Sequence, residues 1–203
     1  IERSFDPASI VHLEALKRAW QTQADHSPAA ELAWLAITAI LRPCSSAGTA
    51  QWQYILPNKT KKKVLHPTIA FRQQVEMMAY DMRWMQSQVE QSYACLISGD
   101  ARNFATNVEQ KVDAVITSPP YANNYDYADA LRFEMTFWGE VNGWGDIHDK
   151  VRKYLIVSSS QHSSKEKLNA EEMLSLPVIA PIHTELAEVV HQLAATRENH
   201  GGK

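Results

Sequence analysis

The residues best suited to chemistry stand together at 118–121, where the sequence reads Ser-Pro-Pro-Tyr. They follow an apolar run, residues 112–117, whose composition is typical of a buried strand. Two consecutive prolines remove two backbone donors and fix two φ angles, so a strand must stop there with its carbonyls held in one orientation. We call these four residues the proline corner. A hydroxyl at Ser118, an unpaired carbonyl at Pro119 and a flat ring at Tyr121 suit a planar heterocycle with an exocyclic amino group, because the ring can stack while the amine donates.

The proline corner resembles the catalytic motif of the class I S-adenosylmethionine-dependent methyltransferases that modify exocyclic amines of DNA bases. Their motif is Asp, Asn or Ser followed by Pro-Pro and an aromatic residue at the end of a strand, and a Gly-Asp pair typically follows the strand before it. Here Gly99-Asp100 follows the apolar run 94–98. The Ser form is most similar to the branch that methylates cytosine N4, whereas enzymes that methylate adenine N6 usually carry Asp or Asn. The resemblance covers about residues 93–162.

This resemblance implies a role for each residue around the corner. The hydroxyl of Ser118 and the carbonyl of Pro119 would bind the target amine, and Tyr121 would stack on a base flipped out of the duplex. Asn-rich segments and Gly-Asp pairs are also ordinary turn sequences, and Asp126 is better explained as the N-cap of the next helix. The predicted site residues are Ser118, Pro119, Pro120 and Tyr121 for catalysis, Asp100 and Thr117 for the cofactor S-adenosyl-L-methionine, and Asn123, Asn124 and Tyr125 for the substrate.

The expected function is therefore that of a DNA methyltransferase acting at cytosine N4. The N4 lone pair is delocalised into the ring, and acceptors that hold both N–H groups favour a nucleophilic nitrogen and stabilise the positive charge that develops on it. Two alternatives stay open. One is an adenine N6 methyltransferase, and the other is a non-catalytic interaction module or remnant.

The Gly-rich turn with which the family holds its cofactor is absent. None of the seven glycines lies in a Gly-x-Gly turn after a predicted strand. The chain could be a portion of a longer polypeptide, which we favour, a subunit that a second chain completes, or a degenerate remnant. A sheet with few strands exposes its edges, so self-association or a second chain is expected to cover them.

A helical first part and an α/β second part are the elements predicted to position the corner. Asp6-Pro7 and Ser27-Pro28 each combine an N-cap with a proline in the first turn, which starts a helix, and Pro43 is predicted to end the second helix. Apolar residues recur at spacings of four and three between Phe71 and Val89. This stripe predicts a third helix whose apolar face packs on a core.

The predicted fold class is α/β, a partial Rossmann-like methyltransferase sheet with flanking helices and an N-terminal helical region. Residues 94–98 and 113–117 are expected to be adjacent parallel strands of this sheet. The domains expected are a helical region with its connection, residues 1–66, and a partial methyltransferase catalytic domain, residues 67–203. Further predicted elements are strands at 51–56 and 154–158, a helix at 127–138 and a last helix that opens at Pro181.

Composition narrows the class of protein. Of 203 residues, 45% are apolar and 21% charged, which indicates a globular chain, and no apolar run is long enough for a membrane span. The net charge of −3 argues against a broad basic face, so contact with DNA is expected to be local. Two separated cysteines and a polar start favour a cytoplasmic location. The eight histidines are scattered, so no metal site is predicted, and the lysine-rich run 59–63 is expected to be solvated.

Overall fold

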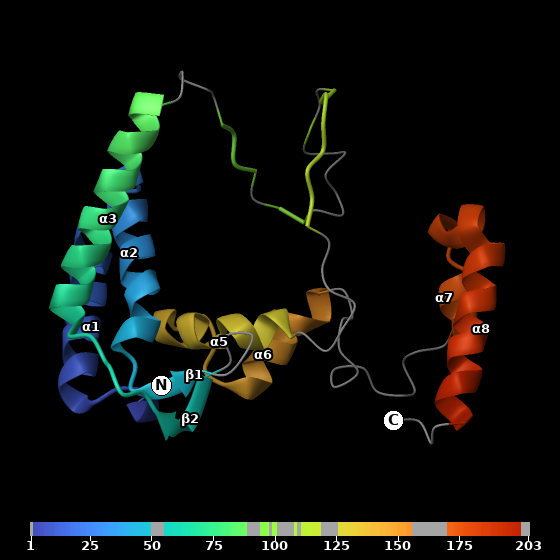
Figure 1. Cartoon of the computed structure of the whole chain (residues 1–203), viewed down its shortest axis with the longest axis horizontal. Coiled ribbons are helices and arrows are strands. Elements are labelled where there is room, and N and C mark those ends of the chain that lie inside the picture. The colour runs from blue at the N-terminus through green and yellow to red at the C-terminus, as the bar shows by residue number, and fades with distance from the viewer. Residues whose placement is uncertain are drawn as a thin grey trace. The chain divides into compact units, whose positions relative to one another are not determined.

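The computed structural model describes residues 2–49, 55–88, 94–97, 99–100, 108, 111–118, 126–155 and 170–199. The chain forms two compact units, which we call the first unit (residues 1–119 with 127–153) and the second unit (residues 120–126 with 154–203). Figure 1 shows the helices and strands of both. Residues on both sides of the predicted domain boundary at 66 belong to the first unit.

The first unit begins with a short 3-10 helix, η1 (Glu2–Ser4), and two long helices, α1 (Pro7–Gln23) and α2 (Pro28–Cys44). Helix α1 packs against α2, and the two lie side by side in Figure 1. Helix α2 runs through Pro43 to Cys44, one residue past its predicted end. A proline so close to the end of a helix removes one backbone hydrogen bond without breaking the turns before it.

Both predicted helix starts are confirmed. The Asp6 carboxylate accepts hydrogen bonds from the backbone N–H groups of Ala8, at 3.1 Å, and Ser9, at 2.9 Å. The Ser27 hydroxyl accepts from the N–H of Ala30 at 3.2 Å. Each side chain satisfies amides that the first turn of a helix leaves unpaired.

A small antiparallel hairpin, β1 (Ala47–Thr49) with β2 (Ile55–Thr60), follows α2. Gly48 lies so close to the opposite strand that a Cβ there would stand 2.8 Å from the Cβ of Lys59, so only glycine fits. The strand predicted at 51–56 overlaps β2 at residues 55–56, and residues 51–54 lie outside the described part of the chain.

Helix α3 (Pro67–Gln88) packs against α2 and α1 (Figure 1). The prediction that its apolar stripe packs on a core holds at Phe71, which lies against the core beside the buried Ala70. Met78 is half-buried, but the prediction is wrong for three other members of the stripe, whose side chains are exposed. These exposed members of the stripe are Val75, Met82 and Met85.

The predicted Rossmann-like parallel sheet is wrong. The antiparallel β1–β2 hairpin is the only sheet among the described residues. The described residues of 94–98 and 112–117 form neither helix nor strand, and Leu96 and Ile116 are 97% and 99% exposed. A parallel strand is stabilised by pairing at its edges and by cover on both faces. An apolar composition alone supplies neither pairing nor cover, so the described residues of these two runs are not strands.

Most of the described residues from Tyr127 to Tyr154 are helical. Helix α5 (Tyr127–Trp138) has the predicted bounds and is followed by Gly139, whose φ of +80° is readily adopted only by glycine. Helix α6 (Trp144–Lys150) and the 3-10 helix η4 (Arg152–Tyr154) come next. The strand predicted at 154–158 is therefore wrong at its first residue, and residues 156–158 lie outside the described part of the chain.

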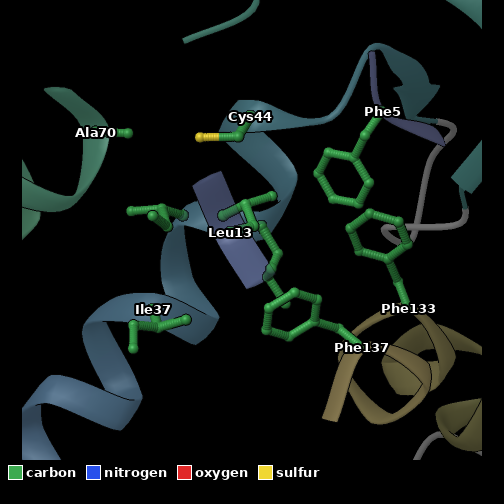
Figure 2. Packing of buried hydrophobic residues seen from close by; sticks show 9 residues of the cluster. Phe5, Leu13, Ile37, Cys44, Ala70, Phe133 and Phe137 are labelled. Atoms are coloured by element: carbon green, nitrogen blue, oxygen red, sulfur yellow. The ribbon is translucent and has the colours of Figure 1, made fainter. Parts of the chain in front are cut away.

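The hydrophobic core of the first unit joins segments far apart in the sequence (Figure 2). The rings of Phe5 and Phe133 stack with centroids 5.4 Å apart, and Phe137 lies nearby. Leu13 is fully buried between them and α2. Cys44 is also fully buried, and its burial raises the pKa of the thiol to about 11, so it stays protonated at neutral pH.

The second unit contains helix α7 (Ala170–Leu174), the 3-10 helix η6 (Pro177–Ile182) and helix α8 (His183–Asn199). The predicted start of the last helix, Pro181, lies inside η6, so α8 begins two residues later than expected. Among the described residues, no helix is both long enough and apolar enough to cross a membrane.

Candidate functional site

Three of the nine predicted site residues lie in the described part of the chain: Asp100, Thr117 and Ser118. All three are exposed and belong to segments without helix or strand. Their side chains are accessible to a ligand, but exposed side chains in an irregular segment do not enclose one. The predicted site residues outside the described part are Pro119, Pro120, Tyr121, Asn123, Asn124 and Tyr125.

The described residues do not fit S-adenosyl-L-methionine, the cofactor that the resemblance implies. Cofactor sites are concave and cover most of the ligand, and a Gly-rich turn lets the backbone approach it closely. Here Asp100 and Thr117 are exposed, and the sequence has no Gly-rich turn of the family's kind. No catalytic step through the cofactor follows from these residues.

Helix α5, which follows the corner in sequence, is fixed to α2 by Arg42. Its Nε lies 2.5 Å from Oε1 of Glu134, and its Nη2 lies 3.0 Å from Oε2 of the same carboxylate. The same Nη2 donates to the backbone carbonyl of Ala130 at 2.6 Å. The guanidinium fork thus matches the carboxylate in two places, and both side chains are largely buried. No sequence signal indicates this pair, because its members are 92 residues apart.

Three charged residues lie at or near the start of α5. Asp126 is buried and immediately precedes the first helical residue, where a cap was predicted. The Nε of Arg132 lies 3.1 Å from Oδ1 of Asp129, three residues earlier on the same helix.

The lysine-rich run 59–63 is only partly solvated. Lys62 and Lys63 are exposed, as predicted. Lys61 instead donates to the backbone carbonyl of Arg42 at 2.7 Å, and burial, with the nearby guanidinium as a second cause, lowers the pKa of its ammonium. Lys61 therefore helps to hold the end of α2 and is not available to a phosphate.

A cavity of about 350 Å³, which the sequence did not lead us to expect, lies along α1, α2 and the start of α3. Most of its larger lining side chains are apolar (Leu16, Trp20, Ile37 and Phe71), and the polar Gln23 also lines it. Small side chains on α2, including Ala30 and Ala33, leave the space open. Closely spaced alanines on α2 were the available sequence signal, but alanine spacing alone does not distinguish an open pocket from a closely packed helix interface.

The indole of Trp20 is held firmly at the wall of this cavity. Its Nε1 donates to the carbonyl of Ala30 at 2.7 Å. Its ring meets Trp138 edge to face, with centroids 5.4 Å apart, and Trp138 also contacts Trp34 and donates to the Thr38 hydroxyl at 3.0 Å. A ring fixed by a hydrogen bond and an aromatic neighbour cannot readily turn to fill the cavity.

No group of His, Cys, Asp and Glu side chains that could hold a metal ion occurs in the described part of the chain. Comparison with protein-family models, with curated proteins and with solved structures finds no match. The functional assignment therefore depends on the motif in the sequence and on the geometry above.

Proposed function

We propose that this chain is the target-base-binding part of a DNA methyltransferase that methylates cytosine N4 with S-adenosyl-L-methionine. The hydroxyl of Ser118 and the carbonyl of Pro119 accept hydrogen bonds from the amine, and Tyr121 stacks on the flipped base. Asn123 and Asn124, with Tyr125 beside them, contact the substrate. The groups that bind the cofactor come from outside this sequence, in a second chain or a further part of the same polypeptide.

The observation that carries this proposal is the order of three features along the chain. An apolar run leads into the proline corner, and an anchored helix, α5, begins six residues after Tyr121. The ion pair of Arg42 with Glu134 gives that helix a fixed place on the first unit. The exposed Ser118 hydroxyl is accessible to an incoming base. The net charge of −3 fits a local contact with DNA and not a broad one.

Ser118→Ala is expected to slow methyl transfer by roughly 10²-fold or more, because it removes one acceptor that is stronger in the transition state than in the ground state. Cofactor affinity should change little, since Ser118 contacts the base. The measurement is single-turnover transfer of a labelled methyl group to DNA by enzyme purified from its host, so that any partner chain stays bound. Unchanged transfer by Ser118→Ala would contradict the role given to this hydroxyl.

Substitution of Tyr121 provides the matched control. Tyr121→Ala should weaken capture of the base by about 1–3 kcal/mol, the value typical of one stacked base. Tyr121→Phe keeps the ring and should behave as the native enzyme in the same assay. If both substitutions weaken capture of the base equally, Tyr121 contributes its hydroxyl and not the face of its ring.

A specific observation also favours the second candidate, a non-catalytic interaction module. Large apolar side chains are exposed in both runs that were predicted to be strands, including Leu96, Val115 and Ile116. Exposed apolar surface is typical of sites that bind another protein. If the native protein has no methyl-transfer activity together with its co-purifying partners, this candidate replaces the first.

A further inference from the structure

The cavity along α1 and α2 has the properties of a small-molecule site and is independent of the proposed function. Its volume of about 350 Å³ lies within the usual range for ligand pockets, roughly 300–1,000 Å³. The pocket is open to solvent on one side, and small side chains of α2, including Ala30 and Ala33, form part of its wall. An apolar ring in contact with Leu16, Trp20 and Ile37 would be removed from water on several sides.

The charge of the residues that line the cavity determines which apolar ligands it favours. Of the residues that the structure describes, Asp25 is the only ionisable one that lines it. Its Oδ1 accepts from the backbone N–H of Ser27 at 3.0 Å, and hydrogen bonds from the side chain and backbone of Ser27 lower the pKa of the carboxyl. The group is therefore ionised at neutral pH. The start of α2, also nearby, carries only about half a positive charge, which the Ser27 cap partly satisfies, so the full charge of Asp25 dominates.

We propose that this cavity binds an arylalkyl amine, a flat apolar ring joined through a short aliphatic chain to an ammonium group. The ring lies against Trp20 and the apolar side chains beside it, and the ammonium group pairs with Asp25. The fixed orientation of the Trp20 indole keeps the cavity wall in place before the ligand binds. Binding therefore loses little side-chain conformational entropy.

Three probes of matched size and different charge test the proposal on the full chain: phenylbutylamine, phenylbutanol and phenylbutyrate. Saturation-transfer NMR detects binding, and calorimetric titration gives the affinities. We expect the amine to bind about two- to fivefold more tightly than the alcohol, the ratio that an exposed ion pair supplies, and the carboxylate to bind more weakly than both. Equal affinities for the three probes, or no saturable binding of the amine, would overturn the proposal.

Variants locate the binding. Ala33→Leu places a larger side chain in the cavity and should reduce amine affinity at least about tenfold, whereas Ala15→Leu, at an exposed position of α1 outside the cavity, should leave it unchanged. Asp25→Asn keeps an acceptor for the Ser27 N–H and should make amine and alcohol bind equally. If Ala33→Leu loses its native circular dichroism, Asp25→Asn alone decides. A preference for the amine that survives Asp25→Asn would place the binding elsewhere and refute the assignment.

Discussion

Leu13→Ala is expected to lower the free energy of unfolding of the first unit by about 2–5 kcal/mol, the largest stability effect of any single change discussed for this chain. Leu13 is fully buried in the core that joins α1, α2 and α5, so its removal forfeits apolar burial and leaves a cavity that the surrounding helices only partly close. All six tryptophans have sequence positions within the first unit. Urea unfolding followed by tryptophan fluorescence therefore measures this unit.

Val11→Ala is the control for this prediction. Val11 lies on the same helix, but its side chain is 63% exposed, so its replacement should change the free energy of unfolding by no more than about 0.5 kcal/mol. Equal losses of stability for Leu13→Ala and Val11→Ala would contradict the packing of α1 described above.

Arg42→Ala is expected to destabilise the first unit by about 2–4 kcal/mol, because it leaves the largely buried Glu134 carboxylate and the Ala130 carbonyl without the guanidinium that serves both. The urea midpoint should fall without a large change in slope. If the proposed function holds, the same change should also reduce DNA binding, since α5, which follows the corner in sequence, would lose its contact with α2.

The exposed pair of Arg72 with Glu76 on α3 offers a matched comparison. Its atoms are 2.8 Å apart, yet both side chains are mostly exposed, and ion pairs of this kind contribute little. Arg72→Ala should leave the unfolding curve close to that of the native chain. If Arg42→Ala also leaves the unfolding curve unchanged, the ion pair of Arg42 with Glu134 does not hold α5 on α2.

Local signals predicted the helices of this chain well, and signals that depend on distant partners did not predict its sheet. Asp6 and Ser27 cap their helices because each cap needs only the next three residues, and α5 ends where Gly139 can take a positive φ. The runs at 94–98 and 112–117 were expected to be strands because they are apolar. Strand formation, however, depends on neighbours that the run itself does not encode.

The same difference between local and long-range signals applies to the candidate site. The helix that follows the corner, Tyr127–Trp138, could be predicted from its own residues, whereas the structure of Pro119–Tyr121 lies outside the described part of the chain and stays a prediction. The pairing of Arg42 with Glu134 could not be predicted, because it joins residues 92 positions apart. The cavity beside Trp20 depends on how α1 packs on α2, which the spacing of alanines alone does not determine.

The most direct test of the central claim is the content of methylated bases in the DNA of the native host. Genomic DNA is digested to nucleosides, which are separated and identified by mass spectrometry, so no recognition sequence need be known. The account predicts N4-methylcytosine in cells with the native gene and its loss in cells that carry Ser118→Ala. Equal amounts of N4-methylcytosine in the two strains, or its absence from both, would contradict the claim that this chain binds cytosine for methylation.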